Sequence, residues 1–278
     1  MTMPFEIRDP DDPRVAAYRG SDVADNAGPE RFVVETEHVV TRLLESDVAV
    51  ESILVTPGRL DAVARGLRGR GRGEVTVMIA ERPLLSAIVG FERHRGAAAL
   101  GQRPQAVDAV AVASGVMGAR GRLTILAAEG IVDPRNIGAI LRAARAFAVD
   151  LVLLDRRCAD PWSRRASRAA MGNNFALHRA LAVVDDLPVA LAELRAALPD
   201  LTLAAATVGD AARPLDAFIR GPALALVVGN EGAGISDDLL DLADVELTIP
   251  MASGVDSLNA GAAAAVLLYA AGGLVGRG

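Results

Sequence analysis

Apolar residues in the first part of the chain alternate between short continuous runs and helical spacing. The runs predict strands at Phe32–Val34, Ser52–Thr56, Val75–Ala80 and Gly96–Leu100. Spacings of three and four residues predict helices at Glu37–Glu45, Leu60–Leu67 and Leu84–Val89. We therefore expect a small α/β domain over residues 31–110. Residues 1–30 are rich in Asp, Gly and Pro, which favours a flexible, loosely packed lead-in.

Strands and helices alternate repeatedly in the rest of the chain. The predicted strands are Leu123–Ala127, Leu151–Leu154, Ala180–Val184, Leu201–Ala205, Ala223–Val228 and Val245–Ile249. The predicted helices are Asn136–Phe147, Arg164–Met171, Leu187–Ala197, Ser236–Leu242 and Leu258–Ala271. This alternation predicts a second α/β domain over residues 111–278, with a mainly parallel sheet covered on both faces. We interpret Gly101–Arg122, rich in Gly, Ala and Val, as a linker or a short extra strand.

The last predicted helix lies in a segment, Leu258 to Leu274, that carries no charge. A helix that is apolar all round is either buried or spans a membrane. Ala and Gly dominate this segment and supply little transfer energy, so we expect a packed core helix and no membrane partner. The acidic N-terminal residues exclude a signal peptide there. The single cysteine, Cys158, excludes an internal disulfide and a cysteine-based metal cluster, which favours a cytoplasmic protein.

The charge distribution suggests a nucleic-acid partner, although the net charge is −6. All 29 basic side chains are arginines, and they form two basic regions. Residues 65–95 carry seven arginines against three acids, and residues 135–168 carry eight against three. Arginine binds phosphate through two parallel hydrogen bonds and stacks on bases. These regions therefore favour RNA as a partner, and we expect Arg142, Arg145 and Arg168 to contact it.

Three segments carry candidate chemistry. In Glu129–Phe147, Asn136 can cap a helix, and Arg142 projects from the polar side of that helix. In Ala223–Ser236, an apolar strand ends at Gly-Asn-Glu-Gly, where glycine lets the backbone approach a ligand or simply makes a tight turn. In Ile249–Tyr269, a loop with Ser253, Gly254, Asp256 and Ser257 joins a strand to the last helix. Each segment alone is also compatible with an ordinary structural role, which is favoured for Asn136 as a helix cap and for Arg142 as a solvated side chain.

Taken together and in this order, the three segments resemble the signatures of the SpoU/TrmH family. They contribute an Asn–Arg pair six residues apart, then Gly-Asn-Glu-Gly, then Ile-Pro-Met followed by Ser-Leu-Asn. Upstream, Phe32–Glu35 with Val39, and His94-Arg95-Gly96, are similar to the family's ribosomal-protein-like substrate-binding domain, and Asp160–Phe175 also matches a family pattern. Two departures are visible: Thr36 replaces the usual Gly after the Glu, and Gly261 replaces a small polar residue.

The resemblance implies an S-adenosylmethionine-dependent RNA 2′-O-methyltransferase that works as a homodimer, with active sites at the subunit interface. It implies a trefoil knot in the C-terminal domain, where backbone near Gly229, Ile249 and Leu258 holds the cofactor, with Met251 close by. The residues implied around the reacting centre are Asn136, Arg142, Glu231, Ser257 and Asn259. Methyl transfer from a sulfonium needs no metal, and we expect none.

Three alternatives stay open. Ribosomal RNA is preferred as the substrate by analogy with the N-terminal domain, but transfer RNA is the alternative. A non-catalytic RNA-binding relative would keep the fold without turnover. A nucleotide-linked dehydrogenase is disfavoured because the spacing of Gly229, Gly232 and Gly234 is not G-x-G-x-x-G. We also expect a chain that begins near residue 110 to dimerise and bind cofactor without the N-terminal domain.

Overall fold

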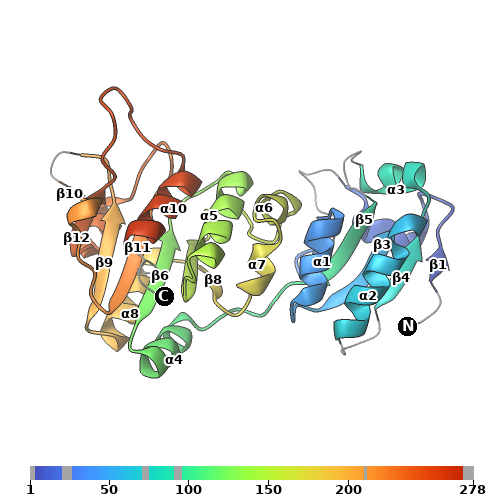
Figure 1. The fold of residues 1–278 in the computed structure, drawn as a ribbon, viewed down its shortest axis with the longest axis horizontal. Helices are drawn as coiled ribbons and strands as arrows, with labels where there is room; N and C mark the ends of the chain where they lie inside the picture. The colour runs from blue at the N-terminus through green and yellow to red at the C-terminus, as the bar shows by residue number, and fades with distance from the viewer. Residues whose placement is uncertain (1–3, 21–26, 71–74, 91–95, 210–211, 272–278) are drawn as a thin grey trace. The chain divides into compact units, whose positions relative to one another are not determined.

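The chain folds into two compact units, shown in a computed structural model (Figure 1). The structure describes residues 4–20, 27–70, 75–90, 96–209 and 212–271. Unit 1 consists of Met1–Gln105 together with Pro161–His178, and unit 2 consists of Ala106–Asp160 together with Arg179–Gly278. The chain therefore crosses between the units three times, where the sequence predicted a single boundary near residue 110.

Unit 1 is built on a five-stranded sheet with the order β1-β4-β3-β5-β2. Its strands are β1 (Phe5–Glu6), β2 (Arg31–Glu35), β3 (Val50–Val55), β4 (Thr76–Ile79) and β5 (Ala97–Gln102). Its first helical elements are η1 (Pro13–Tyr18), α1 (Glu37–Glu45), η2 (Pro57–Arg59), α2 (Leu60–Arg70) and α3 (Arg82–Val89). β5 pairs antiparallel with both β2 and β3, whereas β3 and β1 run parallel to β4.

The described part of the N-terminal lead-in belongs to the core of unit 1. Val15 and Tyr18 of η1 have no exposed surface, and the Tyr18 hydroxyl lies 2.8 Å from the Ser52 hydroxyl of β3. These two side chains join a cluster of buried residues that includes Leu54, Met78 and Leu85. Residues 4–20 thus differ from the loosely packed lead-in that their composition predicts, because their few apolar side chains are the ones that cover the sheet.

Residues 161–178 bring two short helices into unit 1, α6 (Arg164–Ala169) and α7 (Asn173–Ala176). Trp162 and Phe175 both pack on Phe32 of β2, with ring centroids 5.8 Å apart in each case. Arg164 is 3% exposed, and its Nη1 donates to Glu35 Oε1 over 2.6 Å. Aromatic packing and a buried ion pair therefore hold this segment against the N-terminal sheet.

Unit 2 contains a seven-stranded sheet with the order β10-β12-β9-β11-β6-β7-β8 (Figure 1). Its strands are β6 (Leu123–Ala128), β7 (Leu151–Asp155), β8 (Leu181–Val184), β9 (Leu201–Ala206), β10 (Arg213–Pro214), β11 (Ala223–Val228) and β12 (Val245–Thr248). Every pairing among these described strands is parallel, which confirms the predicted sheet. All residues of β6, β7 and β11 are buried, as expected for strands covered on both faces.

Helices cover both faces of this sheet. They are α4 (Ala109–Arg120), α5 (Pro134–Ala146), α8 (Leu187–Ala197), η3 (Leu215–Ala217), α9 (Asp237–Leu242) and α10 (Ala260–Ala271). The side chains of α4, α8 and α9 share one apolar cluster with alternate residues of the strands. Figure 1 shows α5 and α10 side by side on the sheet.

Helix α4 replaces the predicted linker or extra strand. Asp108 caps its first turn by accepting the Ala111 N–H at 3.0 Å, and Gly121 ends it in the left-handed conformation with φ of 61°. Val110, Val112 and Met117 pack against the core of unit 2. The linker prediction was wrong because Gly and Val lower intrinsic helix propensity, whereas burial of this helix's apolar residues outweighs propensity.

Helix α10 is buried on one face only. Its Gly261 lies so close to α5 that a β-carbon there would be 2.6 Å from the Ala139 β-carbon. Steric contact with α5 thus explains why this position has no side chain. Val266 is 39% exposed and Tyr269 is 60% exposed, so within one chain the predicted core helix is packed on one side only. Among the described residues, no helix is both long and apolar enough to cross a membrane.

Candidate active site

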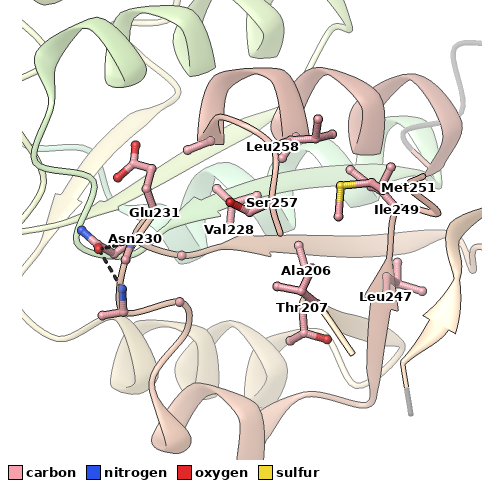
Figure 2. Close-up of a pocket in the computed structure, with 17 residues that line it drawn as sticks. Ala206, Thr207, Val228, Asn230, Glu231, Leu247, Ile249, Met251, Ser257 and Leu258 are labelled. Atoms are coloured by element: carbon pink, nitrogen blue, oxygen red, sulfur yellow. Dashed lines mark hydrogen bonds between the residues drawn. The ribbon is translucent and has the colours of Figure 1, made fainter. Parts of the chain in front are cut away.

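A cavity of about 350 Å³ opens where β9, β11 and β12 end (Figure 2). Parallel neighbours bring their carboxyl ends to one edge of a sheet, where α/β proteins bind ligands. The cavity is lined by Ala206, Thr207, Val208, Val228, Gly229, Asn230, Glu231, Gly232, Ala233, Gly234, Leu247, Ile249, Met251, Ser257, Leu258, Ala260 and Ala263. In Figure 2, Glu231 lies toward one side, Met251 and Ile249 lie toward the other, and Ser257 lies between them.

The turn after β11 is held by its own backbone and by one amide side chain. Asn230 and Gly234 exchange two backbone hydrogen bonds of 2.9 Å. The Asn230 Oδ1 accepts the N–H groups of Gly232 and Ala233 inside the turn (Figure 2). Its Nδ2 donates to the Gly130 carbonyl over 2.7 Å. This tight closure fixes the position of Glu231 at the mouth of the cavity.

Gly229 is required by the turn itself. A β-carbon at this position would lie 2.2 Å from the Gly234 carbonyl oxygen and 2.6 Å from the Ile235 nitrogen. Any side chain would therefore push the turn open before it reached a ligand. Gly229 lines the cavity, but a substitution here would not test cofactor contact cleanly.

Three of the predicted catalytic side chains form a continuous hydrogen-bonded chain. The Asn136 Nδ2 donates to Glu231 Oε1, and the Asn259 Nδ2 donates to Asn136 Oδ1 over 2.7 Å. Asn259 also accepts the Gly261 N–H at 3.0 Å, which caps α10. The segments that follow β6, β11 and β12 thus contribute one side chain each to a single polar cluster beside the cavity.

The cap of α5 explains why Asn136 is available for this cluster. Asp133 is the capping residue and accepts the Arg135 N–H at 2.8 Å, with Pro134 in the first turn. Asn136 therefore lies inside the helix, and the alternative that it caps α5 is wrong. Its amide points instead toward Glu231 and Asn259.

The remaining predicted positions divide into two groups. Ser257, Ile249, Met251 and Leu258 line the cavity, as does Gly229, and their roles toward a cofactor stay predictions. Arg142 lies outside this set. It is exposed on α5, and no described residue is its hydrogen-bond or ion-pair partner.

A network of charged residues lies at the ends of β6 and β7, and it was not identified from the sequence. Glu129, 4% exposed, accepts the Ser236 N–H at 2.8 Å and a hydrogen bond from Arg157 at 2.6 Å. Asp155 accepts from Arg157 Nε at 2.9 Å and from the Gly130 N–H at 3.1 Å. Burial opposes the ionisation of Asp155, but these hydrogen bonds outweigh it and lower its pKa. Carboxylates directly after two adjacent apolar strands were the signal available.

Comparison with known proteins decides the family. A model of the SpoU rRNA methylase family matches residues 123–269, which is the part of the chain that contains the cavity and the polar cluster. The chain belongs to the SpoU rRNA methylase family. This confirms the resemblance carried by the three motifs, and makes the chain an RNA methyltransferase by family.

Relatives of this SpoU methylase extend the likeness to nearly the whole chain. An uncharacterised tRNA/rRNA methyltransferase of Mycobacterium bovis is 34% identical over 95% of this chain and 90% of its own length. RlmP, a 23S rRNA guanosine 2′-O-methyltransferase of Bacillus subtilis, is 30% identical over 86% of this chain and 87% of its own. An AdoMet-bound rRNA methyltransferase from Sinorhizobium meliloti has a TM-score of 0.75 at 22% identity, with 95% of both chains covered, which shows the shared fold.

The arginines predicted to bind RNA differ in their surroundings in this SpoU methylase. Arg142 and Arg145 are both exposed and lie one turn apart on α5. Arg168, in contrast, is 23% exposed and lies 3.4 Å from Glu35, inside unit 1. Its guanidinium therefore serves a structural contact, and the structure gives no support for a phosphate contact there. His94 and Arg95, part of the N-terminal resemblance, lie outside the described residues.

Proposed function

We propose that the chain transfers a methyl group from S-adenosylmethionine to a ribose 2′-hydroxyl of a structured RNA, with ribosomal RNA preferred. The observation that carries this proposal is the cavity of about 350 Å³ with the Asn136–Glu231–Asn259 cluster at its edge. Two relatives are named as 23S rRNA 2′-O-methyltransferases of guanosine, RlmP and RlmB. The preference for ribosomal over transfer RNA rests on these names and on the predicted ribosomal-protein-like domain.

The cavity suits S-adenosylmethionine in size and chemistry. Sites for small ligands have about 300–1,000 Å³, with mostly apolar walls and a few polar groups. Here Leu247, Ile249, Met251 and Leu258 supply apolar surface for a base, while backbone of residues 229–234 supplies polar groups. The AviRb methyltransferase of Streptomyces viridochromogenes, which has the same fold with a TM-score of 0.73 at 24% identity, was crystallised with AdoMet.

The cofactor supplies an activated methyl group, so the protein has to position the hydroxyl and accept its proton. Glu231 is the only ionisable side chain among the described residues that line the cavity. Asn136 donates to its Oε1, and no described residue donates to its Oε2. We assign to Glu231 the acceptance of the 2′-hydroxyl proton as the oxygen–methyl bond forms. Asn136 and Asn259 keep that carboxylate in place.

Arg142 serves the RNA in this proposal. A guanidinium stays protonated in proteins, so Arg142 cannot act as the base. At 100° per residue, Arg142 and Asn136 point about 120° apart around α5. Arg142 and Arg145 form an exposed pair of cations on one helix, suited to bidentate binding of the phosphate beside the target ribose.

A homodimer would cover the exposed face of α10. Tyr269 is 60% exposed and packs edge-on against Phe147 of α5, with ring centroids 6.1 Å apart. Val266 and, in the preceding loop, Val255 add exposed apolar surface. Exposed apolar patches of this kind mark protein–protein contacts. Replacing Val266 and Tyr269 together by Glu should give a monomer in analytical ultracentrifugation, and a dimer that persists would place the interface elsewhere.

The fold's finer features belong to the same proposal. We infer a trefoil knot in unit 2, supported by the insertion of β11 between β9 and β6 and by the close contact of α10 with α5. We also propose that unit 1 is the RNA-binding, ribosomal-protein-like domain. Its five-stranded sheet with helices matches the small α/β domain that the resemblance implies.

Calorimetry with S-adenosylmethionine tests the cavity directly. Ala263 lines the cavity from α10, and Ala263→Leu adds three carbon atoms there without touching the Gly229 turn. We expect this variant to lose most of the affinity, because the new side chain occupies ligand space. Ala196→Leu, an exposed position on α8, is the matched control and should bind normally. Equal affinity in both variants would mean that S-adenosylmethionine does not bind in this cavity. Binding of NAD instead of S-adenosylmethionine would favour a dehydrogenase.

A further inference from the structure

The carboxylate of Glu129 joins two elements that the sequence separates by about a hundred residues. It follows β6 directly and is 4% exposed. Its Oε2 accepts the Ser236 N–H at 2.8 Å, at the end of the turn that lines the cavity. Its Oε1 accepts Arg157 Nη2 at 2.6 Å. A buried carboxylate is retained in a fold only when such charge-assisted bonds satisfy it.

Arg157 extends this connection to the end of β7. Its Nε donates to Asp155 Oδ2 over 2.9 Å, and Asp155 Oδ1 accepts the N–H groups of Gly130 and Cys158 at 3.1 and 2.9 Å. The ends of β6 and β7 and the turn after β11 are thereby held in one network. Both carboxylates of the network are nearly fully buried, whereas the Arg157 side chain is 67% exposed.

The turn from Gly229 to Ser236 has two side-chain ties to the β6 end. Asn230 donates to the Gly130 carbonyl near the start of the turn, and Glu129 accepts from Ser236 at its end. Six consecutive residues of this turn, 229–234, line the cavity, and Glu231 is one of them. Glu129 does not line the cavity, but the N–H that it accepts belongs to Ser236, two residues beyond the last of those wall residues.

We propose that Glu129 is a positioning residue that sets the wall of the cofactor cavity through the Ser236 N–H, with Arg157 orienting its carboxylate. The proposal rests on the function proposed above for that cavity. Ser236 and Arg157 donate to different oxygens of Glu129. A glutamine at position 129 keeps the shape but puts an NH₂ group in place of one of these oxygens, so one of the two donors would face another donor.

Asp150 offers a matched control. It too accepts one backbone N–H, from Thr124 at 2.9 Å, and one arginine, Arg120 at 2.8 Å, with 9% of its side chain exposed. The N–H that Asp150 accepts lies at the start of β6. At about 3.3 Å per residue, Thr124 lies about 17 Å along the strand from Glu129. Asp150→Asn therefore removes the same kind of interaction from the same strand, away from the cavity.

Two measurements on the full-length protein test the proposal. Hydrogen exchange should be faster in residues 229–236 of Glu129→Gln, and unchanged there in Asp150→Asn. Calorimetry should show S-adenosylmethionine bound at least about tenfold more weakly by Glu129→Gln, the scale of one hydrogen bond to a charged group. In methylation kinetics the same variant should raise the cofactor KM more than it lowers kcat, whereas Asp150→Asn should leave both near wild type.

Two results would overturn the assignment of Glu129, and a second variant covers the case in which Glu129→Gln does not fold. Wild-type cofactor affinity in Glu129→Gln means that the wall does not depend on Glu129. Equal weakening in both variants means a general loss of stability. If Glu129→Gln does not fold, Arg157→Met decides, since this exposed side chain is removable: affinity should fall a few-fold, and unchanged affinity refutes the proposal. If the wild type binds no S-adenosylmethionine, the proposed function fails, while the exchange at residues 229–236 still judges whether Glu129 holds the turn.

Discussion

Removal of the Arg164 side chain should unfold unit 1 at a much lower denaturant concentration than in the wild type. Arg164 donates to Glu35, to the Tyr18 carbonyl at 2.9 Å and to the Val89 carbonyl at 3.3 Å. In Arg164→Leu, the 1% exposed Glu35 loses its shortest ion pair, and Arg168 stays 3.4 Å away. Breaking a buried pair from one side costs about 3–5 kcal/mol, a large share of the roughly 5–15 kcal/mol that stabilises a protein.

The only tryptophan of the chain reports this transition. Trp162 is 7% exposed and packs against both Phe32 and Phe175, so its fluorescence follows the unfolding of unit 1. With a urea dependence of roughly 1–3 kcal/mol per molar, the midpoint of Arg164→Leu should fall by about 1–5 M. Arg165→Leu, an exposed neighbour on α6, is the control and should change stability by less than about 0.5 kcal/mol.

The double variant Glu35→Leu/Arg164→Met separates lost charge pairing from lost packing. It leaves no unpaired carboxylate, so it should recover a substantial part of the loss. A midpoint of Arg164→Leu within 0.3 M of the wild type, which is less than about 1 kcal/mol, would refute the reasoning. That result would mean that residues 161–178 are not part of the core of unit 1.

Four further predictions concern single positions. Thr36 has φ of 77°, a conformation that glycine adopts freely, so Thr36→Gly should stabilise the fold by about 1 kcal/mol in urea titration, and a lower midpoint would contradict this. Burial raises the pKa of the Cys158 thiol to about 12, so at pH 8 iodoacetamide should modify the native protein far more slowly than the unfolded one; equal rates would exclude this burial. The lowered pKa of Asp155 stabilises the native state above the unfolded pKa of about 3.9, and this stability is lost as pH falls through the lower native pKa. Asp155→Asn should therefore weaken the dependence of stability on pH below pH 4. An unchanged dependence would argue against this contribution of Asp155. Arg142→Ala should lower turnover by several orders of magnitude and leave cofactor affinity intact, with Arg142→Lys recovering part of the loss; normal turnover in the alanine variant would exclude a role in positioning RNA.

The periodic elements were predictable because their apolar residues repeat with the period of a single structure. The bounds of α1, α8 and β11 agree with the hydrophobic pattern residue for residue. The three motifs were also correctly placed after parallel strands, whose carboxyl ends meet at one edge of the sheet. The cavity is found at that edge.

The rest depended on contacts between distant residues, which no local pattern contains. Nothing around Arg164 indicates that it pairs with Glu35, 129 residues away, and so the sequence suggested a boundary near residue 110. A chain that begins there would leave Trp162 and Phe175 without the surface of Phe32 that they cover. This exposure argues against the expectation that such a truncated chain still dimerises and binds cofactor.

Local chemistry likewise allowed two interpretations of Asn136. A capping role and a site role both fit an Asn near the start of a helix, and the structure separates them because Asp133 already provides the cap. Gly229 shows the opposite case. Its proximity to a ligand was the functional reading, whereas its nearest neighbour is the Gly234 carbonyl of its own turn.

Transfer of labelled methyl groups to RNA tests the central claim most directly. The protein is incubated with methyl-labelled S-adenosylmethionine and either ribosomal or transfer RNA, and the product is hydrolysed in alkali, which cannot cleave next to a 2′-O-methyl ribose. The account predicts label in alkali-resistant dinucleotides from ribosomal RNA, abolished in Glu231→Gln and kept in Asp150→Asn. Label in alkali-sensitive mononucleotides would place the methyl group on a base. Cofactor binding without any transfer would make the chain a non-catalytic relative, and either result would contradict the proposed function.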